Sequence, residues 1–348
     1  MSEIYLGIIG GGQLGSMLSI AAKKLNIKTT VYCDDRNAPA QNFCDEFIFD
    51  DYDNKNKILE FAKKVDFITY EFENIPYETL KEMNKLKPVL PKPSVNRLIQ
   101  HRLAEKDFIN KLNIRTTRYT SIENKNDLQT LEDFLPGILK TTTMGYDGKG
   151  QFVINDINDL DSLNIDFSKN YILEKLVKLK KEISVIISRF GVSNYEIYEP
   201  IENTHEDQIL KHSKIPADIS DDIINQSKEW AIRISEELKY IGTLCVEFFI
   251  DRNENLYVNE IAPRVHNSGH LTINAYNISQ FENHVRAVCS LKKIPLKKLS
   301  NAKMLNLIGS EISKYRQISN FKENEFFFDY LKKEIKEKRK MGHITTLI

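Results

Sequence analysis

The spacing of apolar and polar positions predicts alternating strands and helices in the first quarter of the chain. Residues 4–10 (IYLGIIG) form an apolar run typical of a strand, and residues 16–25 (SMLSIAAKKL) have helical spacing. The same pattern predicts further strands over 28–33, 46–49 and 66–70, and helices over 55–64 and 77–84. Strands that alternate with helices favour a parallel, doubly wound sheet. We therefore predict a Rossmann-like α/β domain over residues 1–95, ended by the proline-rich stretch 87–94.

The middle of the chain, residues 96–290, mixes both periodicities and predicts an α+β domain. We expect a helical connector over 96–112 and a second helix over 221–238. Strands are expected near residues 137–140, 151–155, 171–177 and 183–188. After residue 290, short strands and a charged run at 332–340 predict a small β-rich cap over 291–348.

Two glutamates mark a predicted β-hairpin in the middle region. Residues 244–250 (LCVEFFI) and 256–261 (LYVNEI) are β-branched and aromatic, and a turn-rich segment separates them. Symmetric pairing about that turn places Glu247 opposite Glu260 and Phe249 opposite Val258. Cβ atoms of facing residues are only about 5 Å apart. Two such anions must share a proton or hold a cation between them.

Oxygen ligands of this kind favour Mg²⁺, which binds one or two carboxylates and completes its shell with water and substrate phosphates. The alternative is that each glutamate forms a structural salt bridge with a lysine or arginine. The irregular segment 259–270 (NEIAPRVHNSGH) favours a functional site, because loops rich in donors usually carry function.

Composition and charge narrow the class of protein. A chain of 348 residues is long enough for two or three domains. The 49 basic and 49 acidic residues cancel, so no overall field attracts nucleic acid or an anionic membrane. The four cysteines are scattered without a CxxC pair, which is typical of a reducing compartment. With no apolar leader and no apolar stretch of about 18 residues, we expect a cytoplasmic protein.

The first of two glycine loops has the GxGxxG spacing of a dinucleotide-binding turn. Gly10, Gly12 and Gly15 follow a strand and precede a helix, and Asp34 and Asp35 come about 20 residues later. Alone, this motif predicts a nicotinamide-dependent oxidoreductase. The alternative is a tight strand-to-helix turn whose free N–H groups hold some other phosphate.

The second glycine loop is MGYDGKGQ, residues 144–151, between the strand that ends at Lys140 and the strand that begins at Phe152. Its glycines allow the backbone to approach phosphates, and Lys149 adds positive charge. It lacks the GK[ST] step of a Walker A loop. We predict a lid over a nucleotide, against the alternative of an ordinary glycine-rich turn. A nucleotide-binding regulator without turnover would share this feature.

In combination the motifs resemble the N5-carboxyaminoimidazole ribonucleotide synthetases of the ATP-grasp superfamily. The matching segments cover nearly the whole chain and are GGGQLG at 10–15, EFENIP at 71–76, GYDGKGQ at 145–151, EKLV at 174–177 with Glu182, NEIAPRVHNSGH at 259–270 and KMGH at 340–343. The resemblance implies a preATP-grasp domain, an ATP-grasp body with a lid subdomain at about 115–175, and a cap, assembled as a homodimer. It also replaces the nicotinamide hypothesis, because in this family the first glycine turn serves the ribonucleotide substrate.

The resemblance implies the reaction and the residues that carry it. Bicarbonate would be phosphorylated by ATP to carboxyphosphate, and the amine of 5-aminoimidazole ribonucleotide would then take up the carboxyl group. The implied ATP site comprises Arg102, Lys140, Gly145, Tyr146, Asp147, Gly148, Lys149, Gly150, Gln151, Glu174, Lys175, Leu176, Val177, Glu182, His205, Asn259 and Glu260. Two Mg²⁺ ions would bind at Glu247 and Glu260. The implied ribonucleotide site comprises Gln13, Glu73, Arg264 and His266, with the 5′-phosphate on Lys333 and Arg339.

The residues implied in the chemistry itself are Lys140, Tyr146, Asp147, Lys149, Arg264 and His266. Another ATP-grasp carboxylase or transformylase of nucleotide synthesis is the nearest alternative. The sequence departs from the family pattern at Gln208, where a glycine is usual, and at Ala262, where many ATP-grasp enzymes have asparagine.

Overall fold

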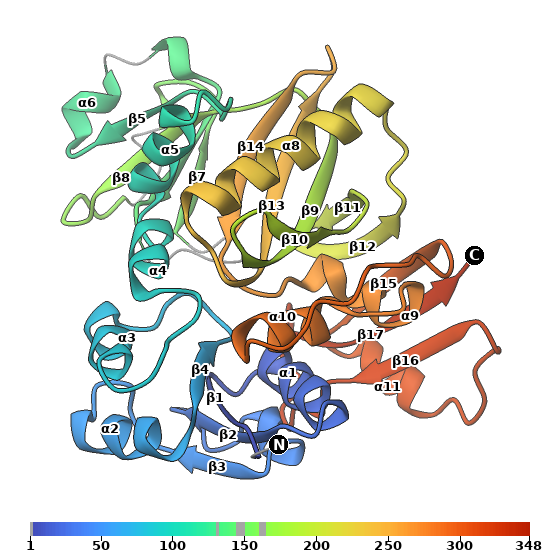
Figure 1. The fold of residues 1–348 in the computed structure, drawn as a ribbon. Coiled ribbons are helices and arrows are strands. Elements are labelled where there is room, and N and C mark those ends of the chain that lie inside the picture. The colour runs from blue at the N-terminus through green and yellow to red at the C-terminus, as the bar shows by residue number, and fades with distance from the viewer. Residues whose placement is uncertain (1–2, 130–131, 144–149, 160–164) are drawn as a thin grey trace.

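Three β-sheets organise the chain (Figure 1). The structure is a computed structural model that describes residues 3–129, 132–143, 150–159 and 165–348. One sheet belongs to the N-terminal domain, one to a smaller subdomain in the middle of the chain, and the largest spans the rest of the middle region and the C-terminus. No helix in these described ranges is long and apolar enough to cross a membrane.

The N-terminal sheet has four parallel strands in the order β3-β2-β1-β4, which confirms the predicted doubly wound class. The strands are β1 (Tyr5–Ile9), β2 (Lys28–Cys33), β3 (Glu46–Phe49) and β4 (Phe67–Tyr70). The helical segments are α1 (Gln13–Lys24), η1 (Pro39–Asn42), α2 (Lys55–Lys64) and α3 (Tyr77–Asn84). Leu14, Met17 and Leu18 of α1 join one buried cluster, and Phe61 of α2 and Leu80 of α3 join another.

A helix from the middle region completes the N-terminal core. Phe281, Val285 and Val288 of α10 (Gln280–Val288) pack in the same cluster as α1. His284 of α10 accepts the backbone N–H of Thr243 at its Nδ1 (3.0 Å), so its Nε2 donates to Thr69 Oγ1 on β4 (2.7 Å). Burial lowers the pKa of His284 to about 4, so this bridge between the two domains is neutral.

The connector between the domains is two helices, so the prediction of one helix over 96–112 is wrong. The helices are α4 (Pro93–Ile99) and α5 (Arg102–Lys111). His101 adopts an extended conformation between them (φ −115, ψ 104), and its side chain accepts the backbone N–H of Ala104 at 3.4 Å. The imidazole thereby takes up a backbone donor that the start of a helix otherwise leaves unpaired.

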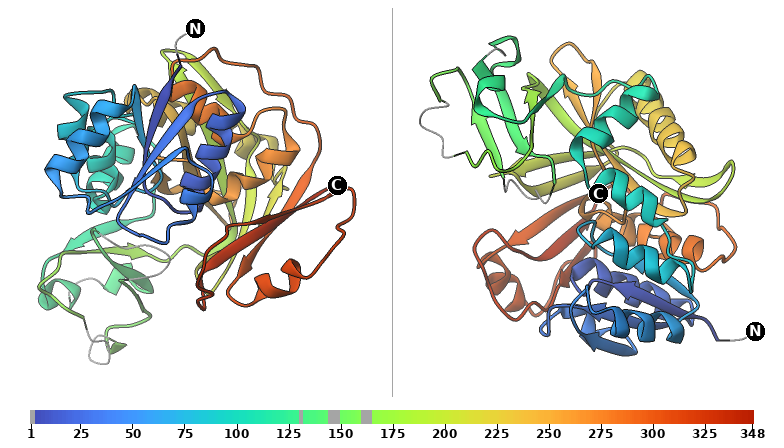
Figure 2. Two further views of the ribbon diagram at one scale, coloured as in Figure 1. Left: turned by 90° about the horizontal axis from the view of Figure 1, so that it is seen from below. Right: turned by 90° about the vertical axis from the view of Figure 1, so that its left-hand side faces the viewer.

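The smaller subdomain is an antiparallel sheet in the order β5-β8-β6-β7. It projects beside the large sheet (Figure 2, right). Its elements are β5 (Tyr119–Ile122), α6 (Lys125–Gln129), η2 (Glu132–Phe134), β6 (Gly137–Thr141), β7 (Gln151–Ile154) and β8 (Tyr171–Lys175). Leu139, Ile154 and Leu173 lie in its own buried cluster.

The large sheet has nine antiparallel strands in the order β14-β13-β9-β11-β12-β15-β17-β16, with β10 on β9. The strands are β9 (Leu179–Gly191), β10 (Asn194–Ile197), β11 (Ile201–Glu206), β12 (Ile209–Ile215), β13 (Gly242–Asp251), β14 (Leu256–Ala262), β15 (Ala302–Ile308), β16 (Glu325–Asp329) and β17 (Lys340–Leu347). The remaining helices are α8 (Asp221–Glu237), η3 (Asn267–Leu271), α9 (Thr272–Ala275) and α11 (Glu311–Arg316). Because β12 pairs with β15, the predicted cap shares one sheet with the body.

The register of the carboxylate hairpin agrees with the prediction at the two acids and differs beyond them. Glu247 faces Glu260, as expected, but Val258 faces Phe248 and not Phe249. The register shifts between Glu247 and Phe248, so Asn259 is an extra residue in β14, a β-bulge.

Helix α5 accounts for this bulge. Lys106 Nζ donates to the Asn259 carbonyl at 3.1 Å, and Glu105 Oε1 accepts the Ile261 N–H at 2.5 Å. These backbone groups of β14 are therefore satisfied by side chains of α5, which the spacing of the hairpin alone could not reveal.

Candidate active site

A cleft of about 1060 Å³ is lined by residues from all three sheets and their connections. It gathers residues from every region of the chain that the sequence singled out. The predicted site residues in its lining are Gln13, Glu73, Arg102, Lys140, Gln151, Leu176, Val177, Glu182, His205, Glu247, Asn259, Glu260, Arg264 and His266. Gly145, Tyr146, Asp147, Gly148 and Lys149 lie outside the described residues, so their predicted roles stay predictions.

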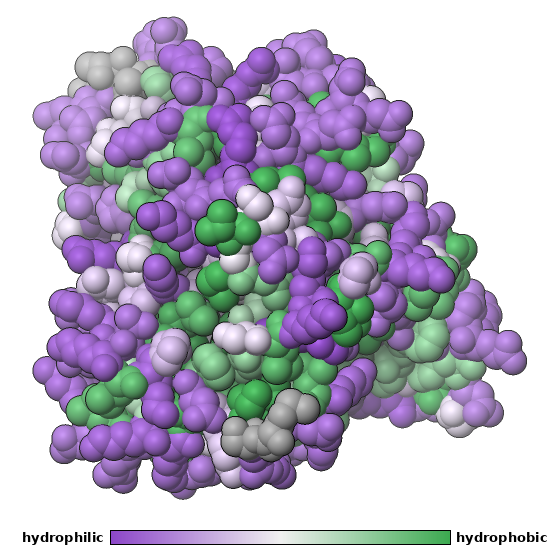
Figure 3. Space-filling view, viewed as in Figure 1, coloured by the Kyte–Doolittle hydropathy of each residue, from purple (hydrophilic) through white to green (hydrophobic). Residues whose placement is uncertain are grey.

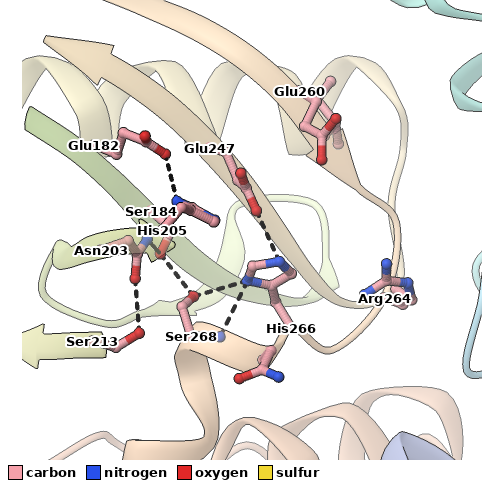
Figure 4. Close-up of polar contacts among 12 residues, drawn as sticks. Glu182, Ser184, Asn203, His205, Ser213, Glu247, Glu260, Arg264, His266 and Ser268 are labelled. Atoms are coloured by element: carbon pink, nitrogen blue, oxygen red, sulfur yellow. Dashed lines mark hydrogen bonds and ion pairs between the residues drawn. The ribbon is translucent and has the colours of Figure 1, made fainter. Parts of the chain in front are cut away.

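The two facing acids each have a nitrogen partner, and Figure 4 shows the contact of Glu247 with His266. His266 Nε2 lies 2.8 Å from Glu247 Oε1, and Arg102 NH1 lies 3.3 Å from Glu260 Oε2. Burial raises the pKa of Glu247, but His266, His205 and Arg264 together lower it to about 2. Glu247 is therefore ionised at neutral pH.

The donor set at these acids fits Mg²⁺. Both side chains open on the cleft, with Glu247 14% and Glu260 41% exposed. Within the described ranges, no group of three or more His, Cys, Asp or Glu residues could hold a metal by itself. Mg²⁺ needs only one or two carboxylates when phosphates and water supply its other ligands.

Two lysines share one buried glutamate at the subdomain side of the cleft. Lys106 Nζ lies 3.1 Å from Glu174 Oε2, and Lys140 Nζ lies 3.0 Å from Glu174 Oε1. Thr117 donates to the same carboxylate at 2.8 Å. Burial opposes the charge on Glu174, but the two lysines outweigh it and lower its pKa well below the usual value. Because Lys140 lines the cleft, this cluster places positive charge where a polyphosphate would lie.

The segment EKLV at 174–177, part of the implied ATP site, is only partly open to the cleft. Leu176 and Val177 line it, whereas Glu174 is occupied by the lysines and Lys175 Nζ donates to the Asp133 carbonyl at 2.6 Å. Gly150 is also absent from the lining; its φ of +71 and its closeness to Thr141 explain why a glycine stands there.

Glu182 and His205 form a pair on adjacent strands that lines the cleft (Figure 4). His205 Nδ1 lies 2.8 Å from Glu182 Oε2. Burial disfavours the charged imidazole, but Glu182 outweighs this and raises the pKa of His205.

Arg264 and Glu73 form an ion pair on the side of the N-terminal domain. Arg264 Nε lies 2.6 Å from Glu73 Oε2, and its NH2 lies 3.3 Å from Oε1. Burial favours the neutral carboxyl, yet Arg264 lowers the pKa of Glu73 below its usual value. This two-point contact fixes the plane of the guanidinium at the cleft wall.

The first glycine turn is filled by an internal carboxylate. Glu71 Oε1 accepts the Gly12 N–H at 2.5 Å and Oε2 accepts the Gly15 N–H at 2.9 Å. A Cβ added to Gly12 would lie 2.6 Å from Glu71 Oε1, so the approach requires glycine. The N–H groups that would bind a dinucleotide's pyrophosphate are therefore occupied, and the nicotinamide hypothesis fails on this ground.

The two cap residues predicted at the 5′-phosphate, Lys333 and Arg339, lie outside the lining of the cleft. Lys333 donates to Asn37 and Arg339 to the Glu334 carbonyl, and neither lines the cleft. Lys340 lines it, and the buried Lys332 donates to Gln13 Oε1 at 2.5 Å. The predicted role of Lys333 and Arg339 at the 5′-phosphate stays a prediction, and the side-chain directions in this charged run depend on how the loop before β17 folds.

Asn267 is a further lining residue that the sequence did not single out. Its Oδ1 accepts Asn306 Nδ2 at 2.8 Å, while its Nδ2 is buried and has no partner among the described residues. Its position inside the motif at 259–270 was the available signal.

Comparison with known proteins agrees with this geometry. The Ribonucleotide synthetase preATP-grasp domain matches residues 1–100, the ATP-grasp domain residues 107–281 and the Phosphoribosylaminoimidazole carboxylase C-terminal domain residues 302–348. The N5-carboxyaminoimidazole ribonucleotide synthase of Staphylococcus aureus (strain MRSA252) is 38% identical, covering 98% of this chain and 92% of the relative.

Solved structures give the same result. An N5-carboxyaminoimidazole synthetase from Staphylococcus aureus complexed with ADP superposes with a TM-score of 0.93 at 35% identity, covering 100% of this chain and 94% of the other. The Aspergillus clavatus synthase in complex with ADP and 5-aminoimidazole ribonucleotide gives 0.91 at 28% identity, covering 99% and 94%.

The fold and the site define an ATP-grasp ligase. Within that superfamily, the chain belongs to the N5-carboxyaminoimidazole ribonucleotide synthases, as the motifs predicted. Its activity is the ATP-dependent carboxylation of 5-aminoimidazole ribonucleotide in purine biosynthesis.

Proposed function

We propose that the cleft carries out this carboxylation through carboxyphosphate, with Mg²⁺ at Glu247 and Glu260. The observation that supports it is the facing pair of acids beside the lysine cluster of Glu174. A bicarbonate oxygen attacks the γ-phosphorus of ATP, and ADP leaves. The amine nitrogen of the ribonucleotide then attacks the carboxyl carbon of carboxyphosphate and loses a proton. Inorganic phosphate leaves that carbon.

In this proposal Lys140 and Arg102 lie at the phosphates of ATP, and Leu176, Val177, Glu182 and His205 surround its nucleoside. Phosphoryl transfer requires mainly positioned positive charge, which the lysine cluster and Arg102 supply. Bound Mg²⁺, in one or two ions, would neutralise phosphate charge next to Glu247, Asn259 and Glu260. Gln151 faces Lys140 across β6 and β7, so in this proposal Gln151 also lies beside the phosphates.

Gln13, Glu73, Arg264 and His266 would surround the ribonucleotide. Arg264 already holds Glu73 in a fixed geometry and donates from NH1 to the Val265 carbonyl at 3.2 Å, so the N–H groups outside these contacts are the ones that would meet the ribonucleotide. Lys340 and Lys332, and not only Lys333 and Arg339, are candidates for the 5′-phosphate, because Lys340 lines the cleft and Lys332 contacts Gln13.

One assay tests the proposal. ADP release is measured with ATP, Mg²⁺, bicarbonate and the ribonucleotide, and then with each component omitted in turn. Release that depends on all four supports it. Release that is unchanged without the ribonucleotide or without Mg²⁺ contradicts it.

We also propose a cytoplasmic homodimer. Apolar residues gather in the lower middle of the face seen in Figure 3, over the region of α1 and α10. Apolar patches of this kind often mark association surfaces. Light scattering on the purified protein tests the homodimer, and a monomer mass at micromolar concentration contradicts it.

A further inference from the structure

A chain of buried hydrogen bonds runs across the large sheet to His266 (Figure 4). It begins at Ser213 on β12, passes through Asn203 on β11 and Ser184 on β9, and reaches Ser268 in η3. The four links measure 2.9 Å (Ser213 to Asn203), 2.9 Å (Asn203 to Ser184), 2.8 Å (Ser184 to Ser268) and 2.9 Å (Ser268 Oγ to His266 Nδ1). The four residues Ser213, Asn203, Ser184 and Ser268 are each no more than 7% exposed.

The backbone N–H of Ser268 indicates the direction of this chain. The Ser268 N–H points to His266 Nδ1 at 3.3 Å, and an amide N–H can only donate. His266 Nδ1 is therefore an acceptor, and its ring proton lies on Nε2, which faces Glu247 Oε1 at 2.8 Å.

With that end fixed, each hydroxyl has one possible role. Ser268 Oγ donates to Nδ1, so it accepts from Ser184 Oγ. Ser184 Oγ in turn accepts from Asn203 Nδ2, and Asn203 Oδ1 accepts from Ser213. Every proton in the chain points toward His266.

The sheet register places this chain directly beside the predicted metal site. Ser184 is the residue opposite Glu247 across β9 and β13, and Glu247 is opposite Glu260 across β13 and β14. Gln280 separately holds the backbone of His266, accepting its N–H at 2.9 Å and donating to its carbonyl at 2.6 Å. The main chain is thus fixed independently, and the hydroxyl chain acts on the ring.

We propose that Ser268, Ser184, Asn203 and Ser213 are positioning residues that hold His266 as its Nε2–H tautomer, with that N–H donated to Glu247. The opposite tautomer would aim a nitrogen lone pair at the carboxylate and repel it. The inference rests on the proposed function only in placing His266 and Glu247 among the reacting groups. Partners that orient a metal-binding side chain commonly change activity 10- to 100-fold when removed.

Asn203→Asp tests the direction of the chain with almost no change of shape. A carboxylate at this position accepts from Ser184 as well as from Ser213. Ser184 must then accept from Ser268, and the Ser268 hydroxyl no longer donates to His266. At Nδ1 the Ser268 hydroxyl contact (2.9 Å) is shorter than the backbone N–H contact (3.3 Å), so with the hydroxyl reversed we expect the variant to carry a proton on His266 Nδ1, whereas the wild type carries it on Nε2.

The measurement is a long-range ¹H–¹⁵N correlation spectrum of the full-length protein with labelled histidine, without ligands. The chain has seven histidines, so the His266 signals are assigned by comparison with His266→Asn. A proton on Nε2 in the wild type and on Nδ1 in Asn203→Asp supports the proposal. A wild type protonated on Nδ1, or an Asn203→Asp spectrum identical to wild type, overturns it.

Ser188→Ala is the matched control. Ser188 lies on the same strand as Ser184 and is equally buried, but its hydroxyl bonds Thr243 Oγ1 at 2.7 Å. Ser188→Ala should leave the His266 signals and kcat unchanged. A shift of the His266 tautomer in this variant would overturn the proposal. Should Asn203→Asp not fold, Ser268→Ala replaces it, with kcat expected to fall about 10- to 100-fold and wild-type kcat contradicting the proposal.

The two proposals can fail separately. The spectrum is recorded on the free protein, so it tests the hydrogen-bond chain whether or not the assigned reaction occurs. The ADP-release assay on the wild type tests the reaction without reference to Ser184 or Asn203.

Discussion

Glu71 holds the backbone N–H groups of Gly12 and Gly15 at 2.5 and 2.9 Å, and so occupies the helix N-terminus that a nicotinamide dinucleotide would need. The carboxylate is buried, and burial raises its pKa despite these donors. The GxGxxG motif of this chain therefore serves an internal contact, in which the carboxylate that follows β4 accepts hydrogen bonds from the backbone at the start of α1. The motif itself does not distinguish this use from phosphate binding, because both require glycine and a free helix N-terminus.

This contact predicts a stability effect for Glu71→Gln. The amide keeps one acceptor but turns an NH₂ group toward a backbone N–H, so one buried donor loses its partner. We expect the free energy of unfolding, measured with urea, to fall by about 1–3 kcal/mol. Glu60→Gln, at an exposed pair with Lys57, should leave the free energy of unfolding nearly unchanged. Equal effects of the two substitutions would contradict the role of Glu71.

Glu260→Gln should abolish turnover and leave the fold intact. Its pair with Arg102 is at the cleft surface, so the melting temperature should change little. Loss of a carboxylate at the phosphates should lower kcat by roughly 10²- to 10³-fold or more, as for other groups that stabilise charge in the transition state. ADP release and thermal unfolding measure the two effects.

Glu254→Gln is the matched control for that experiment, since Glu254 lies at the turn of the same hairpin and pairs with the exposed Lys180. It should keep wild-type kcat. Near-normal activity of Glu260→Gln would remove the proposed metal role.

The sequence predicted most of the elements because they follow from local spacing, whereas the facing acids, although predicted, depend on a bulge as well. The strands 28–33 and 46–49 and the helices 55–64 and 77–84 coincide with β2, β3, α2 and α3, since the apolar period is clear in each. Glu247 and Glu260 face each other because the bulge at Asn259 shifts the register by one residue; the pairing next to the turn, Ile250 with Leu256, would otherwise place Asn259 opposite Glu247.

What the sequence could not predict depends on contacts between distant segments. The bulge at Asn259 follows from Lys106 and Glu105 on α5, about 150 residues away in the chain. Likewise the charged run 332–340 could not show that Lys332 turns inward to Gln13 while Lys333 turns to Asn37.

Gln208 gives a prediction about a departure from the family pattern. It follows Asp207 in the turn between β11 and β12, and φ is +66 at Gln208 and +48 at Asp207. A left-handed conformation costs a non-glycine residue about 1–2 kcal/mol. Glycine removes this cost but raises the conformational entropy of the unfolded chain, which offsets part of the gain. Gln208→Gly should therefore raise the free energy of unfolding by up to about 1 kcal/mol. Glu206→Gly, in the adjoining strand, should lower the free energy of unfolding. An equal decrease in Gln208→Gly would contradict the prediction.

The cluster of Glu174 with Lys106 and Lys140 predicts a pH-dependent stability. The two lysines lower the pKa of Glu174 well below its unfolded value, against the effect of burial. The carboxylate therefore stabilises the fold fully above its unfolded pKa of about 4.3. This stabilisation is lost as the pH falls from there toward the lower folded-state pKa.

Glu174→Gln tests this, because it removes the charge and leaves two buried ammonium groups without a counter-ion. At pH 7 we expect the free energy of unfolding to fall by about 3–5 kcal/mol. The difference from the wild type should shrink as the pH is lowered below about 4.3, since the wild-type carboxylate then loses its advantage. Denaturant unfolding at a series of pH values measures it, with the exposed Glu229→Gln expected to follow the wild type throughout. A pH-independent difference would mean that the hydrogen bonds of Glu174, and not its charge, hold Lys106 and Lys140 in place.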